Sequence, residues 1–182
     1  MGGAGLPERP VCSVRYIMKH VLPLACVWLA AAVGSAPASA QALASPAELL
    51  ALVNAQRAAG AVCGGEPQPP APPLQWHAAP EAAATDHLLD VAQQATLTHD
   101  GSDGSTVGGR LRRHGYVWGG VGENVAAGHT SAALTLQQWL KSPAHCRTLM
   151  QANYRHGAVV GRLVPGSKHG AYWVMVLARP LS

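Results

Sequence analysis

Three short segments of the chain carry side chains that could bind or activate a ligand. They are 99–101 (His-Asp-Gly), 122–124 (Gly-Glu-Asn) and 142–145 (Ser-Pro-Ala-His). Zinc accepts imidazole and carboxylate ligands, and three protein ligands leave its fourth position open. Ser142 and Pro143 are typical residues for the N-cap and first position of a helix, which places His145 in the first helical turn. The positive end of a helix disfavours imidazolium, so His145 is expected to be neutral and able to bind a metal ion.

Common catalytic and nucleotide-binding motifs are absent from the sequence. It contains no G-x-S-x-G, H-E-x-x-H, G-x-x-x-x-G-K-[ST] or G-x-G-x-x-G. The segment 100–104 (Asp-Gly-Ser-Asp-Gly) is similar to the start of a calcium loop. However, Ser102 and Gly104 stand where an EF-hand needs Asp or Asn, and no Glu follows at the twelfth position. We therefore predict a turn there.

The composition predicts one globular domain. The chain has 182 residues, of which 48% are hydrophobic and 12% are charged, and it shows no internal repeat. So few charges argue against a disordered protein. The formal net charge is only +4, and part of it lies in the N-terminal segment described next. A charge this small does not indicate binding to nucleic acid or to an anionic membrane surface.

Residues 1–40 have the features of a secretory signal peptide. Basic residues precede an apolar run over 21–33, and the segment ends in Ala38-Ser39-Ala40, an A-x-A cleavage site. Two alternatives are less consistent with this segment. A membrane anchor needs about 20 apolar residues, and a lipoprotein site at Cys26 would have too few apolar residues before it. We expect cleavage after Ala40, a domain over 41–182 in the periplasm or outside the cell, and no stable membrane anchor.

Cysteine usage fits an exported domain. Cys12 and Cys26 would leave with the signal peptide, so that only Cys63 and Cys146 remain. Two cysteines in an exported chain are expected to form a disulfide. The alternative is a pair of free, buried thiols. No Cys-x-x-Cys is present, which argues against a redox motif and a zinc ribbon.

Cap residues and apolar spacing predict an α+β domain with helices flanking a small antiparallel sheet. The expected helices are 46–60 with Ser45 as N-cap, 80–95, 106–114 with Ser105 as N-cap, 131–141, and a short helix from Pro143. The expected strands are 118–127, 156–163 and 171–178, the last two forming a hairpin. The Pro-rich segment 63–73 is expected to be a surface loop without regular structure.

The order and spacing of these segments resemble the CAP superfamily, which groups cysteine-rich secretory proteins, antigen 5 and plant pathogenesis-related proteins. The similarity is greatest to its bacterial secreted branch. It spans nearly all of the predicted mature domain and includes the following residues: Asn54–Arg57, Leu74–Trp76, Arg110, Gly115–Tyr116, Trp139 to Cys146, and Tyr172–Trp173. The resemblance implies an α-β-α sandwich.

The resemblance also implies a cleft lined by two His and two Glu that can bind a divalent metal. His99 matches the first His and Glu123 the first Glu, while His145 matches a His that bacterial relatives place in the same region. Ser142 stands in place of the second Glu, and Ala171 in place of the second His. The expected metal ligands are therefore His99, His145 and Glu123, a three-ligand set for an ion such as zinc.

The sequence also leads to an expectation for Arg110 and leaves the role of Glu123 open. Arg110 is expected to line the cleft, and Glu123 could bond to backbone or to Arg110 in a purely structural role. The other histidines of the predicted mature chain are expected on the surface or in loops: His77, His87, His114, His129, His156 and His169.

Three classes of function are consistent with the sequence. The first is a binding module that presents the cleft to a lipid, a glycan or a peptide. The second, the main alternative, is a metal-dependent hydrolase with Glu123 as general base. This alternative is weaker, because no oxyanion donor or leaving-group acid can be named. The third class is a structural envelope protein with no ligand.

Overall fold

The computed structural model describes residues 42–181. The predicted signal peptide, its cleavage site, Cys12 and Cys26 lie outside the described residues. The described residues all belong to the second of two units along the chain, Ser39–Ser182. Within them, no helix is long and apolar enough to cross a membrane.

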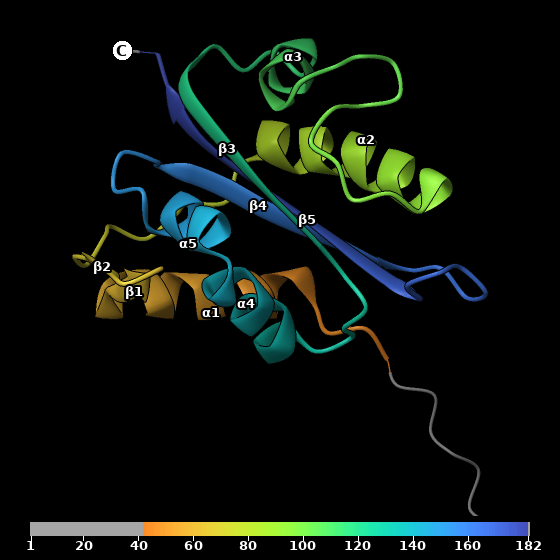
Figure 1. The fold of residues 1–182 in the computed structure, drawn as a ribbon. Coiled ribbons are helices and arrows are strands. Elements are labelled where there is room, and N and C mark those ends of the chain that lie inside the picture. Colours follow the sequence, from red (N-terminus) through yellow and green to blue (C-terminus); the bar gives the residue numbers. More distant parts are fainter. Residues whose placement is uncertain (1–41, 182) are drawn as a thin grey trace, which may run out of the picture. The chain divides into compact units, whose positions relative to one another are not determined.

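The second unit is a three-stranded antiparallel sheet between two layers of helices (Figure 1). Strand β5 (Ala171–Pro180) lies in the centre, with β3 (Trp118–Ala127) on one side and β4 (His156–Leu163) on the other. One layer contains α2 (Ala78–Gln94) and α3 (Val107–Arg113). The other contains α1 (Pro46–Ala59), α4 (Ala132–Lys141) and α5 (Pro143–Met150). The α+β class and the sandwich are confirmed.

Two apolar cores form because the central strand is covered on both faces. Successive side chains of a strand point to opposite faces. Accordingly Val174 and Val176 of β5 pack with α2 and α3, whereas Trp173, Met175 and Leu177 pack with α1, α4 and α5. Both sets are fully buried. A near-continuous apolar strand is what such two-sided burial requires.

The predicted helices are present, with changes at their N-termini. Ser45 caps α1 as expected, its Oγ accepting from the N–H of Glu48 at 3.1 Å. The cap of α3 is Thr106 and not Ser105. Helix α2 begins at Ala78 and not at Pro80, because Nδ1 of His77 accepts from the N–H of Ala79 at 3.1 Å. Histidine is an uncommon cap, so this start has no clear signal in the sequence.

The Pro-rich segment contains more regular structure than predicted. Strands β1 (Ala61–Cys63) and β2 (Glu66–Gln68) form a short antiparallel hairpin. Gly64 and Gly65 connect them with φ of 63° and 92°, the left-handed conformation that two-residue hairpin turns require. The expectation of an irregular loop from residue 63 was therefore wrong for this part.

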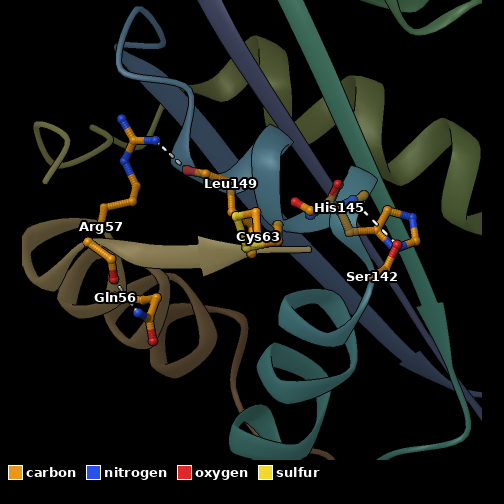
Figure 2. The surroundings of a disulfide bond; sticks show 9 residues. Gln56, Arg57, Cys63, Ser142, His145 and Leu149 are labelled. Atoms are coloured by element: carbon orange, nitrogen blue, oxygen red, sulfur yellow. Dashed lines mark hydrogen bonds between the residues drawn. A yellow bond between two sulfur atoms is a disulfide. The ribbon is translucent and has the colours of Figure 1, made fainter. Parts of the chain in front are cut away.

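The predicted disulfide between Cys63 and Cys146 is present and joins β1 to α5 (Figure 2). Both cysteines are fully buried. Beside it, the buried guanidinium of Arg57 in α1 donates to the carbonyl of Leu149, near the end of α5. The hairpin, α1 and α5 are thus linked around the segment that carries His145.

Candidate functional site

The structure brings His99, Glu123 and His145 to one place from three different elements. His99 lies in the loop that follows α2, Glu123 lies in the middle of β3, and His145 lies in the first turn of α5. Nδ1 of His99 is 3.0 Å from Oε1 of Glu123. The ring centroids of His99 and His145 are 6.3 Å apart. His99 therefore contacts the carboxylate and faces the second imidazole.

Glu123 is the buried centre of this arrangement. Its side chain is only 2% exposed, and Nη2 of Arg110 donates to Oε2 at 2.8 Å. Arg110 is also buried, and it donates to the carbonyl oxygens of His99 and Ser105 at 3.0 and 2.9 Å. The structural alternative for Glu123, a bond to Arg110, is thus present. Arg110 ties the His99 loop to α3.

The carboxylate determines which nitrogen of His99 is available to a ligand. A carboxylate oxygen only accepts hydrogen bonds, so Nδ1 of His99 carries the hydrogen and donates to Glu123. In the neutral ring the lone pair is then on Nε2. The side chain is 57% exposed. Its hydrogen bond to Glu123 raises the pKa of His99 above the ordinary value, against an opposing effect of burial.

The environment of His145 lowers its pKa, whereas that of His99 raises it. It is half-buried, and burial lowers the pKa of His145, with a further contribution from the charge of His99. Ser142 caps α5 as predicted, with 3.5 Å between its Oγ and the backbone nitrogen of His145 (Figure 2). The side chain of Asn124 donates to the carbonyl oxygen of His145 at 3.1 Å, which joins α5 to β3. A neutral His145 is therefore supported, with burial as the main cause.

His87 is a member of this network that the sequence analysis missed. It was expected on the surface, but it is 1% exposed and lies inside α2 against the sheet. Its Nε2 donates to the carbonyl oxygen of Thr98 at 2.7 Å and is 3.5 Å from Oε1 of Glu123. The sequence signal that could have identified His87 as buried is its position four residues after Ala83 and four before Val91, on the apolar face of the helix.

Two other histidines that were expected on the surface or in loops contact each other. His77 caps α2, and its ring lies 4.7 Å from that of His156. Nδ1 of His156 is 2.8 Å from the hydroxyl of the buried Tyr116. These two side chains are partly buried and form a second polar cluster, away from His99.

The predicted ligand set of His99, His145 and Glu123 fits a metal ion only in part. Across residues 42–181, no three His, Cys, Asp or Glu side chains are placed to hold one ion together. Both oxygens of Glu123 already accept hydrogen bonds, from Arg110 and from His99. These bonds leave Glu123 only its remaining lone pairs for an ion, and its side chain is 2% exposed. The two imidazoles remain available, with the carboxylate behind one of them.

Comparisons with known proteins agree with the sequence resemblance. The profile of the family described as the cysteine-rich secretory protein family (CAP) matches residues 50–177. No curated protein sequence matches the chain.

Solved structures of bacterial proteins share the fold. One is an extracellular protein containing an SCP domain from Bacillus anthracis, with TM-score 0.60 and 24% identity, covering 73% of this chain and 39% of that one. Another is an outer surface protein from Borrelia burgdorferi, with TM-score 0.57 and 16% identity, covering 76% and 97%. A cysteine-rich secretory protein from Staphylococcus aureus has TM-score 0.54 and 16% identity, covering 74% and 38%. The chain thus spans well under half of the Bacillus and Staphylococcus proteins.

Proposed function

Because the chain belongs to the cysteine-rich secretory protein family, we propose that it is an exported binding module centred on the His99–His145 pair. The family match covers most of the described domain. Structural relatives described as extracellular, outer surface and secretory proteins support a site of action outside the cytoplasm.

The observation that carries the proposal is the hydrogen bond from His99 to the buried Glu123. A carboxylate that accepts from one ring nitrogen fixes the tautomer and raises the basicity of the other nitrogen, as it does behind metal-binding histidines. Burial keeps the nearby His145 in the neutral form that binds metal ions. The hydrogen bond therefore holds His99 in place, and the pair presents two imidazoles to a ligand.

We assign His99 and His145 as ligands for a divalent ion such as zinc, with Glu123 as their support. This changes the role of Glu123 from that of the predicted third ligand. Two protein ligands leave further positions of the ion to water or to a group on the recognised lipid, glycan or peptide. We expect weak binding, since structural zinc sites use four protein ligands.

The hydrolase alternative has less support. A general base must reach the proton it removes, directly or through one water. Glu123 is buried, and each of its oxygens already accepts from a neighbour. A carboxylate with a side chain only 2% exposed has little access to the water it would have to activate.

Calorimetric titration of the exported protein with zinc tests the proposal. His99→Ala and His145→Ala should each abolish measurable binding. Glu123→Gln should weaken it by roughly 10- to 100-fold, the usual effect of losing such a support. The control is His169→Ala, in the connection between β4 and β5, which should bind like the wild type. Equal affinity in His99→Ala, His145→Ala and the wild type would place any zinc elsewhere and contradict the assignment.

A further inference from the structure

A separate cavity of 290 Å³ lies on the other side of the buried network. It is formed by α2, the loop over 101–105 and α3. It includes His87 and Arg110 among its lining residues, but neither His99 nor His145. Its volume is at the lower end of the range for small-molecule sites. A ligand bound there would therefore not need to contact His99 or His145.

Two deeply buried side chains at this cavity have a polar atom without a protein partner. They are Nδ1 of His87 and Nε of Arg110, and both residues are 1% exposed. Because Nε2 of His87 donates to the Thr98 carbonyl, Nδ1 of the neutral ring has a lone pair and no hydrogen. Native proteins rarely leave such groups unpaired, and the free acceptor on His87, a lining residue of the cavity, points to a hydrogen-bond donor from outside the chain.

The remaining lining includes three aspartates, Asp86, Asp90 and Asp103, and one further cation, Arg113. Asp103 is paired with Arg113 at 3.0 Å, and Arg110 is paired with Glu123. Asp90 accepts from the backbone and hydroxyl of Ser102 and from Gln94.

The charge of Asp90 is met by hydrogen bonds and by the nearby His87, which also lowers the pKa of Asp90, and not by a Lys or Arg side chain. Although burial raises the pKa of Asp90, these hydrogen bonds lower it overall, so the group is ionised at neutral pH. Asp86, the other acidic residue here, has His114 as its partner at 2.8 Å. Among the described residues, neither Asp86 nor Asp90 has an ion pair with Lys or Arg. The cavity therefore favours a cation.

We propose that this cavity binds an aliphatic primary ammonium group, such as the one at the end of a lysine side chain. An ammonium has three donors, and Asp86, Asp90 and Nδ1 of His87 all present acceptors. Leu89 lies between the two aspartates on α2 and is 47% exposed at the cavity, where it offers an apolar wall to a methylene stem. A bare metal ion fits less well, since no three ligands among the described residues are placed to hold one.

Chemical-shift titration of the exported, isotope-labelled protein tests this assignment. The probes are Nα-acetyl-lysine methylamide, its neutral norleucine analogue, and glucosamine, which carries an ammonium without an aliphatic stem. We expect saturable shifts at residues 86–90 and 101–105 with the lysine probe, and none with the norleucine probe. Glucosamine should bind several-fold more weakly than the lysine probe.

Variants separate a specific site from general charge. Asp90→Asn should weaken binding of the lysine probe about tenfold, because a hydrogen bond to an ionised group is lost. Asp86→Asn provides a second test if the first variant disturbs the Ser102 loop. The control Glu66→Gln removes the same charge from the exposed β2 strand and should leave binding unchanged. His145→Ala should also leave it unchanged, which distinguishes this cavity from the proposed zinc site.

Three outcomes would overturn the proposal. One is the absence of any saturable shift with the lysine probe, which would leave the cavity to water. Another is equal binding of the norleucine probe, which would show that the ammonium is not recognised. The third is equal weakening by Glu66→Gln and Asp90→Asn, which would reduce the effect to net charge.

Discussion

Glu123 organises the candidate site at the scale of single residues. It is buried with Arg110, orients His99 and lies within 3.5 Å of His87. The sequence indicated His99, Glu123, His145 and Arg110 because their motifs have a recognisable order. It did not indicate His87, since one histidine on an apolar helix face carries no motif. It left open whether Glu123 bonds to backbone or to Arg110, because the observed contact with Arg110 depends on how α3 packs against β3.

The pKa values of the two histidines of the site should be shifted from the ordinary value in opposite directions. In metal-free buffer, the pKa of His99 should lie above the ordinary value because of its hydrogen bond to Glu123, and that of His145 below it because of burial. His99 then stabilises the fold below its unfolded pKa, and this contribution is lost as pH rises through the folded pKa. His145 stabilises it above its unfolded pKa, and this is lost as pH falls through the folded one.

NMR pH titration of both rings measures these directions. Glu123→Gln should lower the pKa of His99, because the negative acceptor is removed. In His145→Ala, which keeps that acceptor, His99 should still titrate above the ordinary value. A wild-type His99 that titrates at or below the ordinary value would contradict its hydrogen bond to Glu123.

At the scale of elements, the chain's own cap and turn residues explain most of what was predictable. Ser45, Ser131 and Ser142 cap α1, α4 and α5 with their hydroxyls, as local chemistry dictates. The β1–β2 hairpin was missed because prolines mask a turn that Gly64-Gly65 supports. Prolines disfavour strands, whereas a Gly-Gly pair favours a two-residue hairpin turn.

The disulfide should contribute strongly to stability because it joins elements far apart in the chain. Its sequence separation is 83, and closing a long loop reduces the entropy of the unfolded chain. The double variant Cys63→Ala, Cys146→Ala should lower the free energy of unfolding by about 2–5 kcal/mol. Urea unfolding measures this, and reductant added to the wild type should reproduce the loss. An unchanged midpoint in both experiments would contradict a structural role for the bond.

At the scale of the domain, both apolar cores depend on one strand. Side chains of β5 alternate between the α2–α3 layer and the α1–α4–α5 layer. The sequence predicted the helices, the three strands of the main sheet and, through the family resemblance, their layering. It did not predict that Trp173 would lie over Gly161, where an added Cβ would be 2.5 Å from the indole. That contact is set by the register of β4 against β5, which no local pattern encodes.

The shared strand should make the domain unfold as one unit. Leu88→Ala in the α2 core and Leu49→Ala in the α1 core should each lower the free energy of unfolding by about 2–5 kcal/mol, since both side chains are buried. Leu181→Ala is the matched control and should change it by less than about 0.5 kcal/mol, because Leu181 is 61% exposed. Tryptophan fluorescence and far-ultraviolet circular dichroism should report the same midpoint in every variant. If Leu49→Ala instead separated the two signals into distinct transitions, the layers would unfold independently and β5 would not couple them.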